Sequence, residues 1–288
     1  MLLNIVTLTY NQSSVVQALA KSLIAHCSHH FKNGDMKWIL RDNGSDRAGD
    51  SIGNIFTMSE LGGRSKYFEA FNYPNEGTFA SMHNELIPKL KDSMFTLFLN
   101  DDTVALHDFI TPMIDLLKRD DKIGAVGANL TYPDGKIQHA GVVISEDKTP
   151  YNVSDKTSHH FKFSDLIPGA TRHYQACTGA CLMVRTQDFI ALGGFDEQFH
   201  WCYDDVDLCL MIKHLLRKDI VYCHKARMIH HENTSLVKRI EAGELKDLKV
   251  RNAQGKLMDK WKAVLQPDAF LYKANYGFIE GNQNANIQ

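Results

Sequence analysis

Short apolar runs alternate with longer amphipathic stretches through the first half of the chain. The runs are rich in strand-forming residues and each ends in a small polar turn, whereas the stretches between them carry apolar residues at helical spacing. Strands that alternate with helices predict an α/β fold with a parallel sheet and right-handed crossovers, so the polar turns should line up along one edge of the sheet. We expect strands at 3–9, 37–41, 67–71, 95–99 and 123–129, and helices at about 13–28, 78–91 and 108–119.

The alternation is lost after residue 129. A Tyr-Pro-Asp-Gly-Lys segment at 132–136 has the composition of a hairpin turn. The stretch 146–171 is polar and lacks a period, which predicts a long, mobile loop of the kind that is often functional. We expect strands at 137–145, 174–185, 220–223 and 226–229, helices at 188–192 and from about 204, a last helix that wraps back with Trp261 and Phe270 as anchors, and disorder at 281–288.

Two clusters of acidic residues interrupt this pattern. The first follows the apolar run 95–99 directly and consists of Asn100, Asp101 and Asp102. Adjacent carboxylates repel one another unless a divalent cation or solvent relieves the charge, and oxygen ligands suit Mg²⁺ or Mn²⁺. An Asp-rich turn without a metal would have the same composition. The cluster by itself therefore leaves both a metal site and a solvated turn open.

The second cluster comprises Asp204, Asp205 and Asp207 at the start of a predicted helix. Carboxylates in the first turn of a helix complement the helix dipole. That effect accounts for one or two of the three acids without any catalytic role.

Composition places few constraints on the function. Of the 288 residues, 44% are hydrophobic and 23% are charged, as in an ordinary soluble globular protein. The formal net charge of −2 gives no global field that would attract nucleic acid or an anionic membrane. A local exception is the stretch 238–262, with eight Lys or Arg against four Asp or Glu. It offers a peripheral membrane contact, although such runs are more often a solvated helical face.

The six cysteines contain no CxxC pair and do not form the framework of a short secreted chain. We expect reduced, mostly buried thiols, and the spacing argues against a zinc site. Residues 1–9 lack the basic segment and cleavage site of a signal peptide, and no apolar run of about 18 residues could span a bilayer. The sequence therefore predicts a cytoplasmic protein that is soluble or associated with a membrane only at its periphery.

Five features follow one another along the chain, namely the strand 3–9, the Asp-Asn-Gly-Ser turn at 42–45, the Asn-Glu-Gly turn at 75–77, the Asn-Asp-Asp turn at 100–102 and the Asp-Asp-Val-Asp-Leu cluster at 204–208. In this order the chain resembles the family-two glycosyltransferases of the GT-A fold, in the rhamnosyltransferase-like branch, over residues 2–235. The resemblance implies a Rossmann-like, mostly parallel sheet flanked by helices, with a mixed acceptor-side half. It also implies an inverting transfer of a sugar from a nucleoside diphosphate to a hydroxyl acceptor, in polysaccharide or glycoconjugate synthesis.

The resemblance assigns residues to the metal and to the donor. The metal-binding acid of the family falls on Asp102, with His230 as a late ligand for which His231 competes, and with Mn²⁺ or Mg²⁺ as the cofactor. Asn100 stands in place of the commoner first Asp of that motif. The nucleoside-diphosphate sugar would be bound by Thr9, Asn11, Asp42, Asn43, Asn75, Gly77, Asn84, Asp101, Thr178 and Gly179.

The catalytic base of the family falls on Asp205, and Asp204 replaces the Glu that usually precedes it. Displacement of a nucleoside diphosphate needs a base for the acceptor proton and a cation for the charge on the leaving group, so two separate acidic clusters suit the assignment. Trp201 and Tyr203 could pack against an acceptor sugar. The alternative is that Asp205 only charges the helix start, with Asp204 or Asp207 doing the chemistry.

Two positions depart from the family. Arg41 precedes Asp42 where an apolar residue is usual, and Met211 stands where an Arg is common. The first could alter contacts to the base or phosphates, and the second weakens the expected tie between the helix and the diphosphate.

We expect a GT-A domain at 1–235, divided into a nucleotide-binding half at 1–129 and an acceptor half at 130–235 that share one sheet, and a helical extension with a disordered tail at 236–288. The loop 146–171 is expected to border the acceptor, which could be a glycan, a lipid-linked sugar or another hydroxyl compound.

Two other functions share parts of this pattern. A non-catalytic nucleotide-sugar-binding module would have no reason to keep an acid at Asp205. A nucleotidyltransferase would need a basic, Gly-rich loop after its first strand, which Tyr10, Asn11 and Gln12 do not provide.

Overall fold

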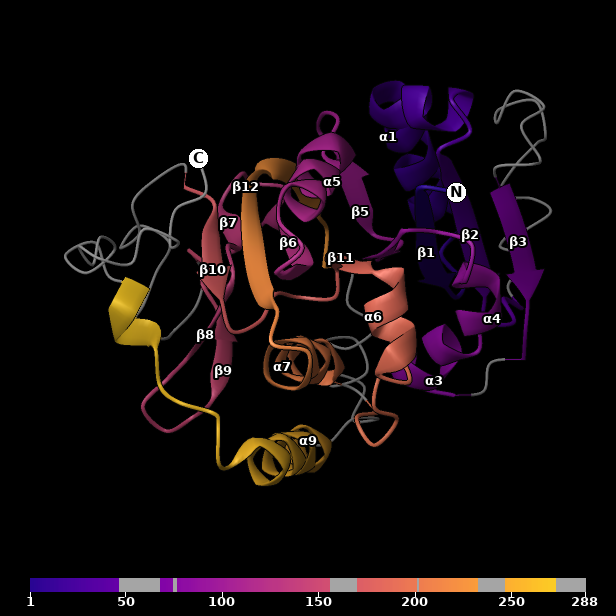
Figure 1. The fold of residues 1–288 in the computed structure, drawn as a ribbon. Coiled ribbons are helices and arrows are strands. Elements are labelled where there is room, and N and C mark those ends of the chain that lie inside the picture. Colours follow the sequence, from indigo (N-terminus) through magenta and orange to yellow (C-terminus); the bar gives the residue numbers. More distant parts are fainter. Residues whose placement is uncertain (47–67, 75–76, 156–169, 201, 233–246, 273–288) are drawn as a thin grey trace.

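The computed structural model describes residues 1–46, 68–74, 77–155, 170–200, 202–232 and 247–272 (Figure 1). Several predictions lie outside these ranges, and they concern Asn75, Trp201, most of the loop 146–171, residues 238–246 of the basic stretch and the tail 281–288.

The half at 1–129, which is expected to bind the nucleotide, is built on four parallel strands in the order β3-β2-β1-β4. Their register brings Thr9, Asp42 and Asn72 level with one another at the carboxyl edge, where open α/β sheets bind ligands. The predicted alignment is therefore confirmed for the ends of β1, β2 and β3, whereas Asn75 and Glu76 of the third turn lie outside the described residues. The four strands are β1 (Leu3–Thr9), β2 (Met36–Asp42), β3 (Phe68–Asn72) and β4 (Phe95–Leu99).

The half from residue 130, together with β6, continues the same sheet with mixed strand directions. β11 (Cys181–Arg185) runs antiparallel between β4 and β6 (Ile123–Thr131), and β12 (Asp219–His230) runs parallel to β6. The full order is β10-β12-β6-β11-β4-β1-β2-β3, with β5 paired to β12 and β7 to β6. The mixed half is therefore confirmed. The short strands are β5 (Thr103–Ala105), β7 (Ile137–His139) and β10 (Arg172–Tyr174), with β8 (Val142–Ile144) and β9 (Pro150–Asn152) forming a separate pair.

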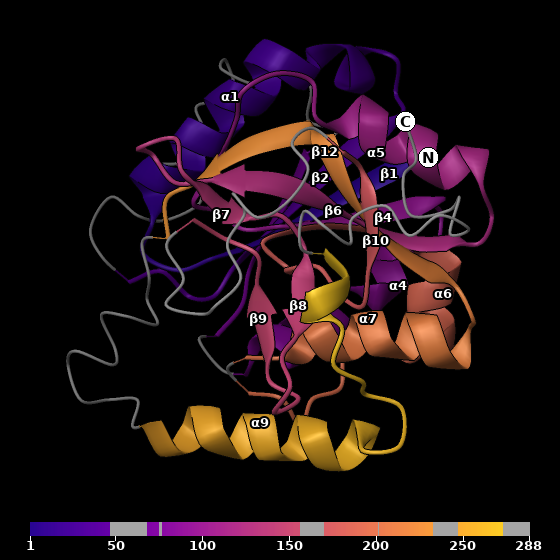
Figure 2. The same cartoon turned by 90° about the vertical axis from the view of Figure 1, so that its left-hand side faces the viewer.

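Helices cover both faces of the sheet and enclose a hydrophobic core on each (Figures 1 and 2). One core contains Leu19 of α1 and Met113 of α5, and the other contains Phe189 of α6, Leu210 of α7 and Leu257 of α9. In both views α9 lies outside α7. The helices are α1 (Ser13–Lys32), α3 (Phe79–Asn84), α4 (Ile87–Leu90), α5 (Ile110–Arg119), α6 (Thr186–Ala191), α7 (Asp204–Leu215), α9 (Asp247–Trp261) and the 3₁₀ turn η3 (Ala269–Tyr272).

The predicted helix 78–91 is wrong as a single element. The structure has α3 and α4 in its place, with Pro88 in the first turn of α4. Proline lacks the N–H that would continue the preceding helix and fits best where a new one begins. Thr78 caps α3, because its hydroxyl accepts a hydrogen bond from the Ser81 N–H at 3.2 Å.

Three predicted strands also have different limits. The run 137–145 bends at Gly141, whose φ is +108° and where a Cβ would lie 2.4 Å from the Tyr174 ring, so β7 and β8 enter different sheets. The run 174–185 is divided into β10 and β11. Conversely, 220–223 and 226–229 belong to one strand, β12, whose register with β6 shifts between Cys223 and Arg227.

The C-terminal helix shares the core of the acceptor half. Leu257 and Trp261 of α9 are buried with residues of α6 and α7. The expected boundary between 235 and 236 stays a prediction, but α9 packs on the domain that was expected to end before it.

All six cysteines are unpaired thiols, and each is buried except the partly exposed Cys202. The prediction of mostly buried thiols is confirmed. Among the described helices, none combines the length and the apolar character that crossing a membrane requires.

Candidate functional site

The loops after β1 and β2 are joined by side-chain hydrogen bonds. Asn11 has a left-handed backbone with φ of 53°, its N–H donates to Ser45 Oγ at 2.8 Å, and its amide nitrogen donates to Asp46 Oδ1 at 2.8 Å. Asp42 Oδ1 accepts from the N–H and the hydroxyl of Ser45 at 3.0 and 2.6 Å. The predicted donor residues Asn11 and Asp42 therefore lie on one cross-linked edge.

Asp42 has a second carboxylate oxygen, Oδ2, besides the one that accepts hydrogen bonds from Ser45. Asp42 is fully buried, and its Oδ2 atom has no hydrogen-bond partner among the described residues. Leaving a buried acceptor unsatisfied costs about 1–3 kcal/mol. This atom is thus placed to accept a hydrogen bond from a bound molecule.

Arg41 lies beneath the same edge. Its guanidinium donates to Asn43 Oδ1 and to Glu85 Oε2, the latter at 2.6 Å, and stacks 4.5 Å from the centre of the Tyr73 ring. Only 1% of Arg41 is exposed. Arg41 stands where the family usually has an apolar residue. Its hydrogen bond therefore holds the amide of Asn43, one of the residues predicted to bind the donor.

Asp102 and His230 meet at the end of β4. His230 pairs with Thr103 where β12 meets β5, and its Nε2 lies 3.0 Å from Asp102 Oδ1. The Nδ1 atom of His230 donates to Gln138 Oε1 at 2.7 Å, which directs Nε2 toward the carboxylate. Of the two competing histidines, the structure places the imidazole of His230 on Asp102, whereas His231 is exposed and donates only its backbone N–H to the Asp102 carbonyl, at 2.9 Å.

This pair fits a divalent metal as part of a larger ligand set. A carboxylate and an imidazole are both metal ligands, and the imidazole favours Mn²⁺ over Mg²⁺. In the described part of the chain, no third histidine, cysteine or carboxylate joins them within ligand distance. The remaining ligands would have to come from a bound diphosphate and water.

Asp101 faces inward beside this pair. Burial raises its pKa to about 7, the charge of Asp102 adds to the rise, and the nearby Thr9 side chain opposes it. The rise in pKa is the effect expected of adjacent carboxylates that repel one another. Thr9 and Asp101, both predicted for donor binding, lie near enough for Thr9 to influence the pKa of Asp101.

The segment 178–180 connects the two acidic clusters. The N–H of Asn100 donates to the Ala180 carbonyl at 3.0 Å, and the N–H of Gly179 donates to Asp205 Oδ2 at 2.7 Å. A Cβ at Gly179 would lie 3.2 Å from the Asp205 Cβ, so a residue without a side chain allows this close approach. The predicted residues Thr178 and Gly179 therefore lie between the metal-binding candidate and the base candidate.

The base candidate lies at a strained turn. Tyr203 precedes α7 with φ of 69°, a conformation that non-glycine residues seldom adopt. Burial raises the pKa of Asp205, while hydrogen bonds from the Gly179 and Val206 N–H groups and the Thr178 hydroxyl oppose the rise by stabilising the anion. Burial and the Asp205 charge raise the pKa of Asp204 to about 8. The hydrogen bonds that Asp205 accepts favour its ionised form, whereas burial beside another carboxylate disfavours a charge on Asp204.

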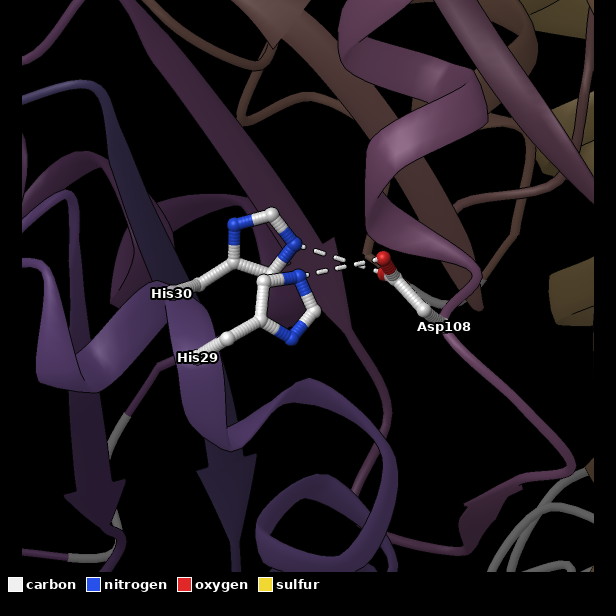
Figure 3. Close-up of side chains that lie close together, drawn as sticks. All are labelled: His29, His30 and Asp108. Carbon is white, nitrogen blue, oxygen red and sulfur yellow. Dashed lines mark hydrogen bonds and ion pairs between the residues drawn. The ribbon is translucent and has the colours of Figure 1, made fainter.

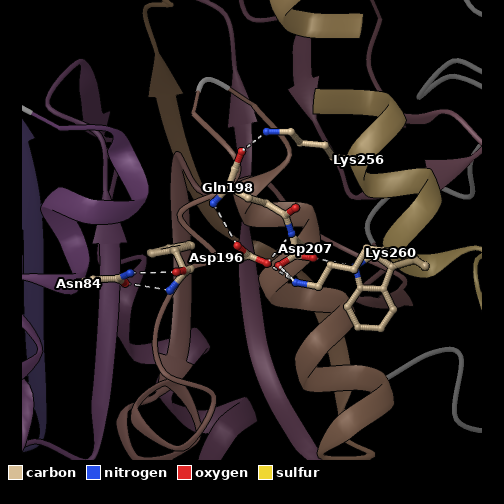
Figure 4. A network of polar contacts seen from close by, with 8 residues as sticks. Asn84, Asp196, Gln198, Asp207, Lys256 and Lys260 are labelled. Carbon is tan, nitrogen blue, oxygen red and sulfur yellow. Dashed lines mark hydrogen bonds and ion pairs between the residues drawn. The ribbon is translucent and has the colours of Figure 1, made fainter. Parts of the chain in front are cut away.

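Asp207 has a different role (Figure 4). Its fully buried carboxylate accepts hydrogen bonds from Lys260 Nζ at 2.8 Å and from the Trp261 indole at 2.7 Å. Lys260 also contacts Asp196 at 2.6 Å, and Lys256 donates to the Gln198 carbonyl at 3.0 Å. Asp207 thus ties α7 to α9, and these lysines of the basic stretch are engaged within the protein.

Asn84 and Gly77 are placed by local structure. The Asn84 amide donates to the Phe195 carbonyl and accepts from the Phe195 N–H, both at 2.8 Å, which holds the turn after α6 (Figure 4). Gly77 has φ of +113°, which a side chain would strain. Donor binding by these two residues stays a prediction.

Two further residues belong to the site and were missed from the sequence. Gln138 orients His230 and has a buried amide nitrogen without a partner among the described residues. His139 donates to Asn152 Oδ1 at 2.7 Å, its Nε2 faces the Thr178 N–H at 3.4 Å, and burial lowers its pKa to about 4. Adjacent polar residues in a strand after a hairpin turn were the available signal.

The chain is similar in sequence to several curated bacterial proteins, although no known family model matches it. It is 26% identical to the uncharacterized protein y4gI of Sinorhizobium fredii over 81% of this chain and 25% of that protein. It is 30% identical to the O-antigen biosynthesis protein RfbC of Myxococcus xanthus over 57% of this chain and 12% of that protein. It is 22% identical to the rhamnosyltransferase WbbL of Escherichia coli over 84% of this chain and 89% of that protein. The chain therefore spans a quarter or less of the first two relatives.

Solved structures share the fold. The crystal structure of GalNAc-T7 with UDP, GalNAc and Mn²⁺ matches with a TM-score of 0.62 at 12% identity, over 80% of this chain and 44% of that one. The mannosyltransferase PcManGT from Pyrobaculum calidifontis, in complex with GDP-Man and Mn²⁺, matches with a TM-score of 0.59 at 11% identity, over 94% of this chain and 66% of that one. The GT-A fold and the resemblance to rhamnosyltransferase-like proteins are therefore confirmed.

Proposed function

We propose that this chain, which has the GT-A fold and a sequence similar to a rhamnosyltransferase and to an O-antigen biosynthesis protein, is a metal-dependent inverting glycosyltransferase. It would move a sugar, with a deoxyhexose the first candidate, from a nucleoside diphosphate to a hydroxyl acceptor such as a glycan or a lipid-linked sugar. The observation that carries the proposal is the Asp205 carboxylate, which the Gly179 N–H holds beside the segment that also contacts the Asp102 turn.

The donor would lie across the carboxyl edge of β1, β2 and β4. The free Oδ2 atom of Asp42 can accept a hydrogen bond from a nucleobase, and the cross-linked loop at Asn11 shapes the edge around it. Because Arg41 already holds the amide of Asn43, that amide has less freedom to contact the nucleotide than the family pattern suggests.

Asp102 and His230 would hold the divalent metal, with the donor diphosphate as a further ligand. A bound Mn²⁺ or Mg²⁺ would neutralise charge on the departing diphosphate. Gln138 supports this role, since its carbonyl oxygen keeps the proton of His230 on Nδ1 and leaves the Nε2 lone pair available.

Asp205 would act as the general base. The acceptor hydroxyl attacks C1 of the sugar, its proton passes to Asp205, and the nucleoside diphosphate leaves from the opposite face, so the anomeric centre is inverted. The backbone hydrogen bonds keep Asp205 ionised before the reaction, and its raised pKa strengthens it as a proton acceptor. Asp204 is less suited to this step, because burial beside another carboxylate raises its pKa to about 8 and favours its protonated form.

The first test is donor binding. A panel of UDP-, GDP- and dTDP-sugars is added to the protein with Mn²⁺ or with EDTA, and the melting temperature is measured. We expect a metal-dependent rise with one nucleotide class, and loss of that rise in Asp102→Ala. Equal nucleotide-sugar binding by Asp102→Ala and the parent, with and without EDTA, would show that the metal assignment is wrong.

The second test separates an enzyme from a binding module. The donor that stabilises the protein is incubated with glycan and lipid-linked acceptors, and both transfer and hydrolysis are followed. Turnover by the parent supports the proposal. Metal-dependent donor binding without turnover on any acceptor, or in its absence, would favour the non-catalytic module.

A further inference from the structure

Two adjacent histidines and one aspartate converge on the sheet face that α1 and α5 cover (Figure 3). His29 and His30 lie near the end of α1, and Asp108 lies just before α5. The Nε2 atom of His29 is 3.2 Å from Asp108 Oδ2, and the Nε2 atom of His30 is 3.3 Å from Asp108 Oδ1. One ligand atom from each residue lies within 4.8 Å of the other two.

The carboxylate is held in place by the start of α5. Asp108 Oδ1 accepts hydrogen bonds from the N–H groups of Ile110 and Thr111 at 3.1 and 3.2 Å, and Asp108 Oδ2 accepts from the Thr111 hydroxyl. The Thr111 hydroxyl also lies 3.2 Å from His30 Nε2. Partners of this kind orient the ligands of metal sites and fix their direction.

We propose that His29, His30 and Asp108 form a second metal site, which takes a divalent transition metal such as Zn²⁺ rather than the hard cation expected at Asp102. Two imidazoles and a carboxylate are a typical ligand set for zinc, with water completing a tetrahedral shell. Zinc bonds of about 2.0–2.1 Å at tetrahedral angles separate ligand atoms by about 3.3 Å. Both histidine-to-carboxylate distances already have this value.

The site is open to solvent on one side. The His29 side chain is 52% exposed and that of His30 is 12% exposed, so a metal can reach the site from the side of His29. The cysteine spacing argued against zinc in this chain, but here histidines supply the ligands.

The metal would fasten α1 to the segment that leaves the Asn100-Asp101-Asp102 turn. That segment passes through β5, where the Ala105 N–H donates to Ser22 Oγ of α1 at 3.0 Å. The expected role is therefore structural, and it can be measured without any transfer reaction.

Zn²⁺ binding to the full chain is measured by calorimetry after removal of metals by chelation, in an Asp102→Asn background that disables the other candidate site. Co²⁺ serves as an absorbing substitute that reports imidazole ligation. We expect one equivalent of Zn²⁺ to bind, with affinity at least about tenfold weaker after His29→Gln, His30→Gln or Asp108→Asn. Asparagine retains an oxygen that can accept from the start of α5, so Asp108→Asn should still fold.

His26→Gln is the matched control, because His26 is an exposed histidine of the same helix outside the cluster. It should leave the Zn²⁺ affinity unchanged. Zn²⁺ should also raise the melting temperature of the parent and of His26→Gln but not of His30→Gln. Absence of Zn²⁺ binding in the Asp102→Asn background, or equal losses from His26→Gln and His30→Gln, would show that the three residues form an ion pair only.

Discussion

The two acidic clusters contain the same residue type and differ in what faces it. Asp102 ends a buried strand and meets an imidazole, which makes the pair a natural metal ligand set. Asp205 lies at the start of a helix and accepts hydrogen bonds from backbone N–H groups, which stabilise a carboxylate without pairing it with a positive charge. The comparison shows that the chemistry of each cluster is set by its partners from other elements, because the carboxylates themselves are alike.

The second cluster repeats this lesson within a single helical turn. Asp205 accepts hydrogen bonds from the Gly179 and Val206 N–H groups, Asp204 is buried beside another carboxylate, which raises its pKa to about 8, and Asp207 is paired with Lys260. Helix-dipole arguments treat these three acids as equivalent, but their surroundings differ.

The largest expected effect comes from removing the base. Asp205→Asn retains the size and hydrogen-bonding oxygen but cannot take a proton, so transfer should fall by roughly 10²-fold or more while donor binding survives. Transfer kinetics and donor titrations of Asp205→Asn and Asp204→Asn, both checked for folding by circular dichroism, measure this. A transfer rate near the parent level in Asp205→Asn would show that Asp205 is not the general base.

Next in size is the neutralisation of Asp207. Lys260→Met leaves a fully buried carboxylate with only the Trp261 indole, and should lower the free energy of unfolding by about 2 kcal/mol. Lys256→Met is the matched control, because Lys256 donates only to an exposed carbonyl contact and should change stability by less than about 0.5 kcal/mol. Urea unfolding compares the two, and equal losses would remove the special role of Lys260.

A smaller effect concerns the pH dependence of stability. The pKa of Asp204 is raised to about 8 in the folded state, so between its usual value of 3.8 and pH 8 the folded protein binds a proton that the unfolded chain has lost. Stability should therefore fall as pH rises through this window. Asp204→Asn cannot ionise and should lose less stability between pH 5 and pH 8, by about 1 kcal/mol or more. The free energy of unfolding of both proteins is measured across this range. An equal change with pH in the two proteins would contradict the raised pKa of Asp204.

The smallest expected effect tests the first cluster. Gln138→Leu removes the acceptor that orients His230, and should weaken Mn²⁺ binding in the presence of a nucleoside diphosphate by about tenfold. Gln138→Glu keeps an acceptor oxygen and should restore the affinity. Calorimetry with Mn²⁺ gives both values. An unchanged affinity in Gln138→Leu would show that Gln138 does not orient His230 for metal binding.

Much of the fold of residues 1–129 could be predicted from the sequence because its signals are local. The strands that end at Thr9 and Asp42 are recognisable in the sequence as apolar runs followed by polar turns. The register of the sheet then brings Thr9 and Asp42 level with one another. The division of 78–91 at Pro88 was also a local signal, but helical periodicity on both sides obscured it.

The partners that decide chemistry could not be predicted, because they are distant in the chain. Gln138 reaches His230 across 92 positions, Lys260 reaches Asp207 across 53, and His30 reaches Asp108 across 78. The composition of the sequence around each of these residues does not indicate which distant residue it contacts. The sequence therefore indicates which side chains carry chemistry, and the fold supplies the contacts that determine their states.

The contact between Asp207 and Lys260 also has a consequence for how the protein is made. A ribosome delivers α7 well before α9, so the nascent chain holds the Asp207 carboxylate without its lysine and indole partners while the sheet beneath it is already complete. Sealing an unpaired carboxylate into a core is costly, so α7 should dock loosely until translation passes residue 261. The helix that carries Asp205 would therefore become fully ordered only after the last strand has been synthesised. The turn at Asp205 would be among the latest parts of the new protein to mature.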